Sequence, residues 1–212
     1  MNLIIKNYEN IKSLINNSNV KILAVSKTFP YELIKPLVEH GHEHFGENKV
    51  QEAKVKWTDV KKNKPNLKLH MIGKLQSNKS KEAVHLFDYI HSLDSQKLAS
   101  LLSKHEKNIN KNLKYFIQVN LTKEKQKGGI GVDSLDDFFN YCTKDLKLDI
   151  IGLMAIPPND GRESIYFKNL MELNLSLGLK ELSMGMSKDF KEAIKYKATF
   201  VRIGSSIFGD RT

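Results

Sequence analysis

Cysteine is almost absent from this sequence of 212 residues, and its single occurrence, Cys142, excludes a framework of internal disulfides. Long hydrophobic runs are absent too, because no apolar stretch approaches the roughly 18 residues that a membrane span needs. The first residues lack the basic segment, apolar core and small-residue cleavage site of a signal peptide. We therefore expect a soluble cytoplasmic protein that makes no contact with a membrane.

Arginine is scarce, which matters because a net charge of +10 otherwise suits a protein that binds nucleic acid. Of the 34 basic residues only Arg162, Arg202 and Arg211 are arginine, and the lysines are scattered through predicted helices and loops. They do not alternate with aromatic residues, as they would along a single-stranded nucleic acid. We predict no nucleic-acid binding.

Two kinds of binding motif are missing as well. No Gly-x-Gly-x-x-Gly follows the first apolar run, which argues against an open sheet that binds a dinucleotide. His42 and His44 alternate as neighbours on a strand would, but no third ligand stands at a recognisable metal spacing. Cys142 lies in a predicted amphipathic helix with Phe138 and Phe139, so we expect a small buried apolar side chain rather than a nucleophile.

Short apolar runs recur along the chain and predict eight strands, at residues 21–25, 43–46, 67–73, 88–93, 115–121, 149–156, 181–186 and 200–205. Most gaps between them carry apolar residues at helical spacing. Alternating strands and helices favour parallel pairing, and eight parallel strands can close into a single TIM-like (β/α)8 barrel. We expect one domain over residues 1–212, preceded by an extra N-terminal helix whose apolar stripe is Ile4, Tyr8, Ile11 and Ile15.

A lysine and two serine-containing loops suggest a ligand. Lys27 ends the first apolar run, where partial burial can lower the pKa of an amine and favour a Schiff base. Ser187 follows the seventh run, and Gly204 and Ser205 follow the eighth, the two places where such barrels often bind phosphate. An amine and a phosphate cradle on one face predict pyridoxal 5'-phosphate as the cofactor. Each part alone has a plain reading, because Lys27 is one of 31 lysines and Ser187 could cap a helix.

Arg202 lies inside the last apolar run, where an inward-facing guanidinium needs an acceptor. A pyridine nitrogen could be that acceptor, and the positive charge would then keep the nitrogen unprotonated and make the cofactor a poorer electron sink. A carboxylate such as that of Glu47 is the alternative. The residues alone do not favour one over the other.

The chain resembles the YggS/PROSC-type pyridoxal phosphate homeostasis proteins over nearly all of its length. The resemblance rests on six motifs in order: AVSKT at 24–28, FGENKVQE at 45–52, HMIGKLQSNK at 70–79, GLM at 152–154, LSMGMSKD at 182–189 and VRIGSSIFG at 201–209. Two positions depart from the family pattern. Leu69 stands where a tryptophan is frequent, and Lys197 stands where a glycine is common.

The resemblance implies a barrel of the alanine racemase N-terminal type, which is fold type III of the pyridoxal phosphate proteins. It implies a Schiff base on Lys27 and a ring nitrogen near Arg202. The remaining implied cofactor contacts are Ser187, Gly204 and Ser205 at the phosphate, Asn48 and Met154 at the ring, and Ser183 in support of the phosphate loop. Lys127 matches a family lysine to which no role is given.

The resemblance also bears on catalysis. Related racemases and decarboxylases add a β-rich domain that closes the site, and we expect none after Arg211 and Thr212. Racemisation needs an acid or base on each face of the substrate, and only one lysine is evident. We therefore predict a monomeric, non-catalytic carrier or regulator of pyridoxal phosphate that acts in vitamin B6 homeostasis, with pyridoxal phosphate-dependent apo-enzymes as its expected recipients. The alternatives are a small pyridoxal phosphate-dependent amino-acid racemase and a barrel for another sugar or nucleotide phosphate.

Overall fold

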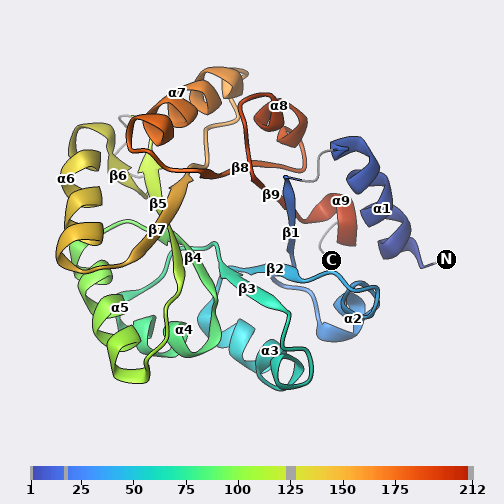
Figure 1. The fold of residues 1–212 in the computed structure, drawn as a ribbon. Helices are drawn as coiled ribbons and strands as arrows, with labels where there is room; N and C mark the ends of the chain where they lie inside the picture. The colour runs from blue at the N-terminus through green and yellow to red at the C-terminus, as the bar shows by residue number, and fades with distance from the viewer. Residues whose placement is uncertain (1, 17–18, 123–127, 210–212) are drawn as a thin grey trace.

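The computed structural model describes residues 2–16, 19–122 and 128–209, and its centre is a closed parallel barrel (Figure 1). The barrel strands are β1 (Lys21–Val25), β2 (His44–Glu47), β3 (Lys68–Met71), β4 (Tyr89–Leu93), β5 (Lys114–Asn120), β7 (Asp149–Met154), β8 (Glu181–Met186) and β9 (Phe200–Ile203). Closure comes from the β1–β9 and β4–β5 pairings. All eight predicted strands are confirmed; two match at both ends, and the ends of the others differ by no more than two residues.

One further strand was not predicted. β6 (Ile130–Gly131) has two residues and pairs in parallel with the end of β5, at Val119 and Asn120. A pair of residues shows no alternating pattern, so the sequence carries no signal for it. Lys127, just before this strand, lies outside the described residues.

Helices surround the barrel (Figure 1). They are α1 (Leu3–Ile15), α2 (Tyr31–Glu39), α3 (Val50–Asn63), α4 (Ser80–Leu86), α5 (Gln96–Ile109), α6 (Leu135–Asn140), α7 (Glu163–Ser176), α8 (Phe190–Lys195) and α9 (Ser205–Phe208). The predicted stripe of α1 is confirmed, because Tyr8, Ile11 and Ile15 are buried. None of the helices among the described residues is both long and apolar enough to cross a membrane.

The main apolar core lies between the strands and the surrounding helices. Leu69, one of the two positions that depart from the expected family pattern, is fully buried in this core. Cys142 is fully buried as well, and burial raises the pKa of its thiol to about 12, so the thiol stays protonated and unreactive. Lys197 adopts φ 63°, in the left-handed region that glycine adopts without strain. This explains why a glycine suits that turn.

The interior of the barrel is filled differently, because side chains alternate between its two faces along each strand. On β9, Val201 and Ile203 pack into the outer core, whereas Phe200 packs with Phe116 and Met154 in a separate inner cluster. Arg202 shares the inward face with Phe200 and is 4% exposed. The inner face of the barrel therefore carries a charged side chain close to the C-terminal ends of the strands.

Candidate functional site

A cleft of about 690 Å³ opens at the C-terminal ends of the strands. Six of the eight predicted site residues line it: Lys27, Asn48, Ser187, Arg202, Gly204 and Ser205. They come from segments far apart in the sequence, which the parallel barrel brings to one end because all of its strands run in the same direction. The arrangement places an amine, a guanidinium and two serine hydroxyls around a single space.

The backbone before Lys27 is held by a buried charged cluster. Glu47 is fully buried at the end of β2, and its Oε1 accepts hydrogen bonds from Ser26 Oγ at 2.7 Å, Lys56 Nζ at 2.9 Å and Trp57 Nε1 at 2.9 Å. Lys56 Nζ also donates to the carbonyl of Ser26 at 2.8 Å. Burial raises the pKa of the Glu47 carboxyl, and Lys56 opposes that rise.

The backbone after Lys27 is held as well. Thr28 has φ 69°, a conformation uncommon for a residue with a branched side chain, and its N–H donates to Glu52 Oε1 at 2.5 Å. The same Glu52 oxygen accepts from Lys56 Nζ at 3.0 Å. Lys56 therefore ties both peptide neighbours of Lys27 to α3, and such local strain persists only where the surroundings enforce it.

Asn48 is fixed by a close approach of two loops. A Cβ built on Gly73 would lie 2.4 Å from the Asn48 carbonyl oxygen and 2.7 Å from its Cα, so only glycine fits. The Gly73 carbonyl in turn accepts from Ser92 Oγ at 2.6 Å. The loop after β3 thus supports the loop after β2, which explains the glycine in the HMIGK motif.

The two candidate phosphate loops meet at their serines. Ser187 lies in a turn closed from both ends, because Met186 N donates to Asp189 Oδ1 at 2.5 Å and Asp189 N donates to the Met186 carbonyl at 3.1 Å. Ser205 begins α9, and its Oγ lies 3.5 Å from Ser187 Oγ. The first N–H groups of a helix have no intrahelical acceptor, so this junction presents donors to an anion.

Arg202 is a buried cation that binds neutral groups. Nη1 donates to the Ser183 carbonyl at 2.8 Å and to Ser183 Oγ at 2.9 Å, and Nη2 donates to the Ala155 carbonyl at 2.9 Å. Burial lowers the pKa of the guanidinium to about 10, which leaves it charged at neutral pH. Glu47, the alternative partner suggested by the sequence, instead bonds to Lys56.

Met154 and Ser183 are the two predicted site residues that the cleft does not include. Both are fully buried in the barrel interior. Met154 packs against Phe116 and Phe200. Ser183 bonds to Arg202 and to His91 rather than to the loops that carry Ser187 and Ser205, so it contacts the cleft only through Arg202.

Sequence reasoning missed several residues that line the cleft, among them Val25, Ile72, Ile156, Pro157, Pro158, Asn159, Met186, Lys188 and Asp189. One segment did carry a usable signal. Residues 156–159 directly follow β7, and loops at the C-terminal ends of barrel strands are where ligands bind. Lys188 adds a third positive charge beside Lys27 and Arg202, and Asp189 adds one negative charge, which favours an anionic ligand.

Comparisons with known proteins agree with this geometry. The model of the alanine racemase N-terminal domain family matches residues 1–212. The pyridoxal phosphate homeostasis protein of Aquifex aeolicus is 38% identical over 200 residues, which cover 90% of this chain and 87% of that protein. The protein of the same name from Vibrio cholerae is 39% identical over 204 residues, 92% of this chain and 86% of that one.

Solved structures give the same result. PipY of Synechococcus elongatus PCC7942 with PLP bound is 33% identical and superposes with a TM-score of 0.90 over 97% of this chain and 100% of PipY. Alanine racemase of Corynebacterium glutamicum, 17% identical, superposes with a TM-score of 0.75 over 100% of this chain and 64% of the racemase, and so supports the barrel fold alone. The chain therefore belongs to the pyridoxal phosphate homeostasis protein family, whose barrel is the alanine racemase N-terminal domain.

Proposed function

We propose that this protein binds pyridoxal 5'-phosphate reversibly as a Schiff base on Lys27 and acts in intracellular vitamin B6 homeostasis. The observation that carries the proposal is the meeting, in one cleft, of Lys27, the Arg202 guanidinium and the serine junction. Ser187, Gly204 and Ser205 would hold the phosphate, and Asn48 would lie beside the ring. PipY, whose structure was solved with PLP bound, supports the choice of ligand.

Arg202 fits the role of a partner to the ring nitrogen. A guanidinium has five N–H donors, and three of those of Arg202 have acceptors among the described residues. The residue lines the cleft, so the remaining two would donate to the ligand. A permanently charged donor beside a pyridine nitrogen disfavours protonation of that nitrogen, so the bound cofactor would be a weak electron sink.

Gly204 fits a phosphate cradle. Its φ of −114° is open to any residue, and an added Cβ would meet Val25 at an ordinary contact distance of 3.4 Å. Packing against the described residues therefore does not require glycine here. A side chain would narrow the cleft that both residues line, which is the reason we offer for the glycine.

We further propose that the protein is a carrier rather than a dedicated catalyst. The titratable side chains that line the cleft within the described residues are Lys27, Lys188, Asp189 and Arg202. The Asp189 carboxylate accepts the Met186 N–H, and Arg202 stays charged, so neither is a ready base on the face opposite Lys27. We extend this to a monomeric cytoplasmic domain over residues 1–212 that passes cofactor to apo-enzymes.

The site can be tested by the absorption spectrum of the reconstituted protein before and after borohydride reduction, followed by peptide mapping. We expect a visible imine band and a reduced adduct on Lys27. Lys27→Ala should abolish both, whereas Lys188→Ala, which removes a lysine from the same cleft, should keep both. An adduct on Lys188, or no band at all, would refute the assignment.

The carrier role needs a separate measurement. We expect no exchange of amino-acid α-protons with deuterated solvent above the rate given by free cofactor. Exchange that is much faster than free cofactor and lost in Lys27→Ala would establish the alternative, a small amino-acid racemase. Transfer of cofactor to an apo-enzyme, followed by recovery of that enzyme's activity, would support the carrier role directly.

A further inference from the structure

A line of hydrogen-bonded side chains crosses the barrel interior and ends at Arg202. His44 Nδ1 lies 2.9 Å from His70 Nε2, and His70 Nδ1 lies 2.9 Å from His91 Nε2. His91 Nδ1 then lies 2.8 Å from Ser183 Oγ, which accepts from Arg202 Nη1 at 2.9 Å. The line joins β2, β3, β4, β8 and β9 without a break.

The two inner histidines are neutral. His70 and His91 are fully buried, and desolvation holds the pKa of each well below its usual range. His70 stacks on Tyr89 with ring centroids 4.1 Å apart, and His91 stacks on Phe116 at 4.3 Å. Among the described residues no group of three His, Cys, Asp or Glu side chains is arranged to hold a metal ion. Hydrogen bonding to one another is therefore what occupies these nitrogens.

Neutral imidazoles give the line a direction, because each has one N–H donor and one acceptor nitrogen. Arg202 can only donate to Ser183 Oγ. The hydroxyl hydrogen of the buried Ser183 then has His91 Nδ1 as its acceptor, since an N–H at that position would leave the hydroxyl hydrogen without a partner. His91 must donate from Nε2 to His70, and His70 must donate from Nε2 to His44.

We propose that His91, His70 and His44 are positioning residues for Arg202, acting through Ser183 as one polarised chain. Every acceptor atom in the chain faces the buried cation and every N–H points away from it, so the chain stabilises the charge without a carboxylate. The geometry fixes the two Nη groups and leaves the other donors for the cleft. That last step rests on the proposed cofactor site, whereas the chain and its direction do not.

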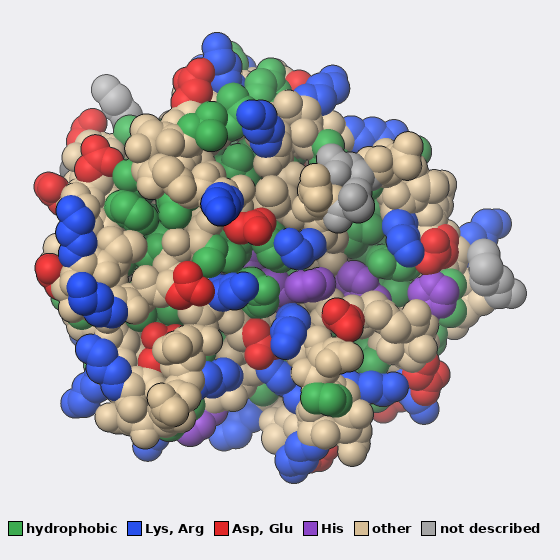
Figure 2. Space-filling view, viewed as in Figure 1, with side chains coloured by type: hydrophobic (Ala, Val, Ile, Leu, Met, Phe, Trp, Pro, Cys, Tyr) green, Lys and Arg blue, Asp and Glu red, His purple; other side chains and the backbone are tan. Residues whose placement is uncertain are grey.

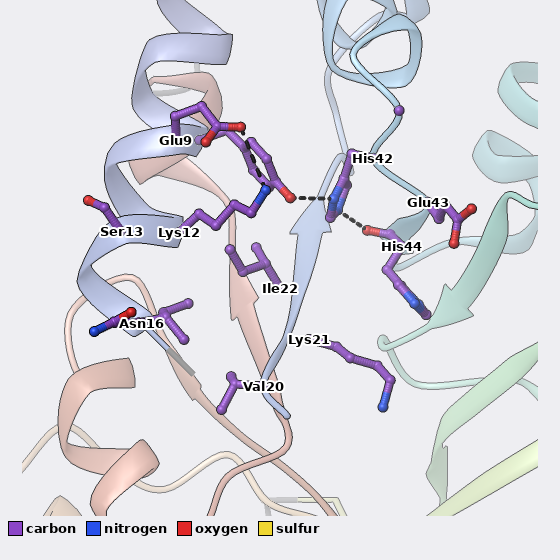
Figure 3. Close-up of a pocket in the computed structure, with 13 residues that line it drawn as sticks. Glu9, Lys12, Ser13, Asn16, Val20, Lys21, Ile22, His42, Glu43 and His44 are labelled. Atoms are coloured by element: carbon purple, nitrogen blue, oxygen red, sulfur yellow. Dashed lines mark hydrogen bonds and ion pairs between the residues drawn. The ribbon is translucent and has the colours of Figure 1, made fainter. Parts of the chain in front are cut away.

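The far end of the chain is accessible from the opposite face of the barrel. His44 lines a second pocket of about 820 Å³ between α1 and the N-terminal ends of β1 and β2 (Figure 3). Histidine side chains also gather in a short row near the middle of the face in Figure 2. His42 lines the same pocket, but its ring bonds to Tyr8 Oη and to the His44 carbonyl, outside the chain. The two residues therefore form a matched pair for a test.

The chain can be tested first without cofactor. Imidazole nitrogen-15 chemical shifts of the wild-type protein distinguish N–H from acceptor nitrogens, and we expect His70 and His91 as neutral Nε2–H tautomers at neutral pH. An Nδ1–H tautomer or an imidazolium at either residue overturns the proposal and leaves the cofactor site untouched. This measurement needs no variant that could fail to fold.

The positioning role is tested at His44, which is remote from the cleft. His44→Leu removes the acceptor for His70, whereas His44→Asn keeps an oxygen near the position of Nδ1. We expect altered Arg202 side-chain N–H signals and about tenfold weaker pyridoxal phosphate binding with a shifted imine band in His44→Leu, and near wild-type behaviour in His44→Asn and His42→Phe. Unchanged Arg202 signals in His44→Leu, or equal effects in His42→Phe, overturn the proposal.

Discussion

Two buried cations, Lys56 and Arg202, lie near the candidate cofactor site and differ in the charge of their partners. The Lys56 side chain is 6% exposed and pairs with the carboxylates of Glu47 and Glu52. Arg202 is 4% exposed and binds two carbonyls and a hydroxyl that is backed by neutral histidines. The carboxylate partners of Lys56 satisfy its charge, so its role is structural, whereas the partners of Arg202 are all neutral. In the proposed function Arg202 would bind the cofactor, so the same kind of charge would support the structure in one place and bind a ligand in the other.

The largest expected effect is the loss of stability in acid, which acts through the neutral histidines behind Arg202. Burial lowers the pKa of His42 and His44 to about 4, and of His70 and His91 well below the usual 6.5. Below pH 6.5 these histidines bind protons in the unfolded chain but stay neutral in the folded one, so the free energy of unfolding decreases as the pH is lowered. Each such histidine contributes about 1.4 kcal/mol per pH unit. Urea unfolding between pH 7 and pH 4.5 measures the slope.

The acid effect has a built-in control. Glu47, Asp94 and Glu106 have raised pKa values through burial, so they take up protons in the folded state first and oppose the histidines. Replacing His44 by Asn should make the slope shallower, because it removes one histidine with a lowered pKa. A flat profile from pH 6.5 to pH 4.5 in the wild type would contradict the assignment of neutral histidines.

Removing the Lys56 charge should lower the stability of the fold more than it changes cofactor binding. Lys56→Met leaves the fully buried Glu47 without its cation, and losing one member of a buried pair costs about 3–5 kcal/mol. Because the pKa of Glu47 is then raised further above its unfolded value, protonation in the folded state should narrow the deficit as pH falls. Denaturation at pH 8 and at pH 5 tests this. Lys54→Met, on the exposed face of the same helix, should change little.

Arg202→Met should have a smaller effect on folding and a larger one on the ligand. It leaves the Ser183 and Ala155 acceptors unsatisfied, at a cost of about 1–3 kcal/mol, partly offset because a desolvated charge is removed. The imine band should shift, since the ring nitrogen loses its charged neighbour. If Arg202→Met and Lys56→Met destabilise the fold equally, the two cations do not differ in their structural role.

The smallest effect is expected at Ser205, where the two candidate phosphate loops meet. Ser205→Ala should weaken pyridoxal 5'-phosphate binding about fivefold through loss of one exposed hydrogen bond to a charged group. Ser206→Ala, a neighbouring serine that does not line the cleft, is the control. Pyridoxal, which lacks the phosphate, should bind both variants equally well. A loss for pyridoxal too would point to a disturbed α9 instead.

How much the sequence could predict differs between the strands and the interior. Eight apolar runs separated by helical spacing were enough for the barrel, because parallel strands buried on both faces are hydrophobic throughout. Lys27, Ser187, Gly204 and Ser205 could be assigned to one cleft because each follows a strand, and parallel strands bring such residues to the same end of the barrel. Arg202, inside the last strand, was singled out by its charge in an apolar run, and Asn48 by the family resemblance.

The histidine chain could not be predicted in the same way. His44, His70 and His91 lie on successive strands, but whether they meet depends on strand register, which hydrophobic pattern does not specify when both faces are buried. The pattern also gave no reason to place Ser183 under Arg202 rather than at a phosphate. The Lys56 cluster was missed because a lysine on a helix usually faces water, and only the observed hydrogen bond from Lys56 on α3 to Glu47 on β2 reveals otherwise.

The pairing of β1 with β9 has a consequence for how the protein is made. Lys21 pairs with Phe200 across the barrel seam, so Lys27 meets Arg202 and Gly204 only after most of the chain has been synthesised. Contacts between such distant segments form late, because closing a long loop costs entropy before any contact repays it. A nascent chain that has reached β8 still lacks Arg202, Gly204 and Ser205. If these residues hold the cofactor as we propose, its capture marks the moment when the barrel has closed and protects the β1–β9 seam from reopening.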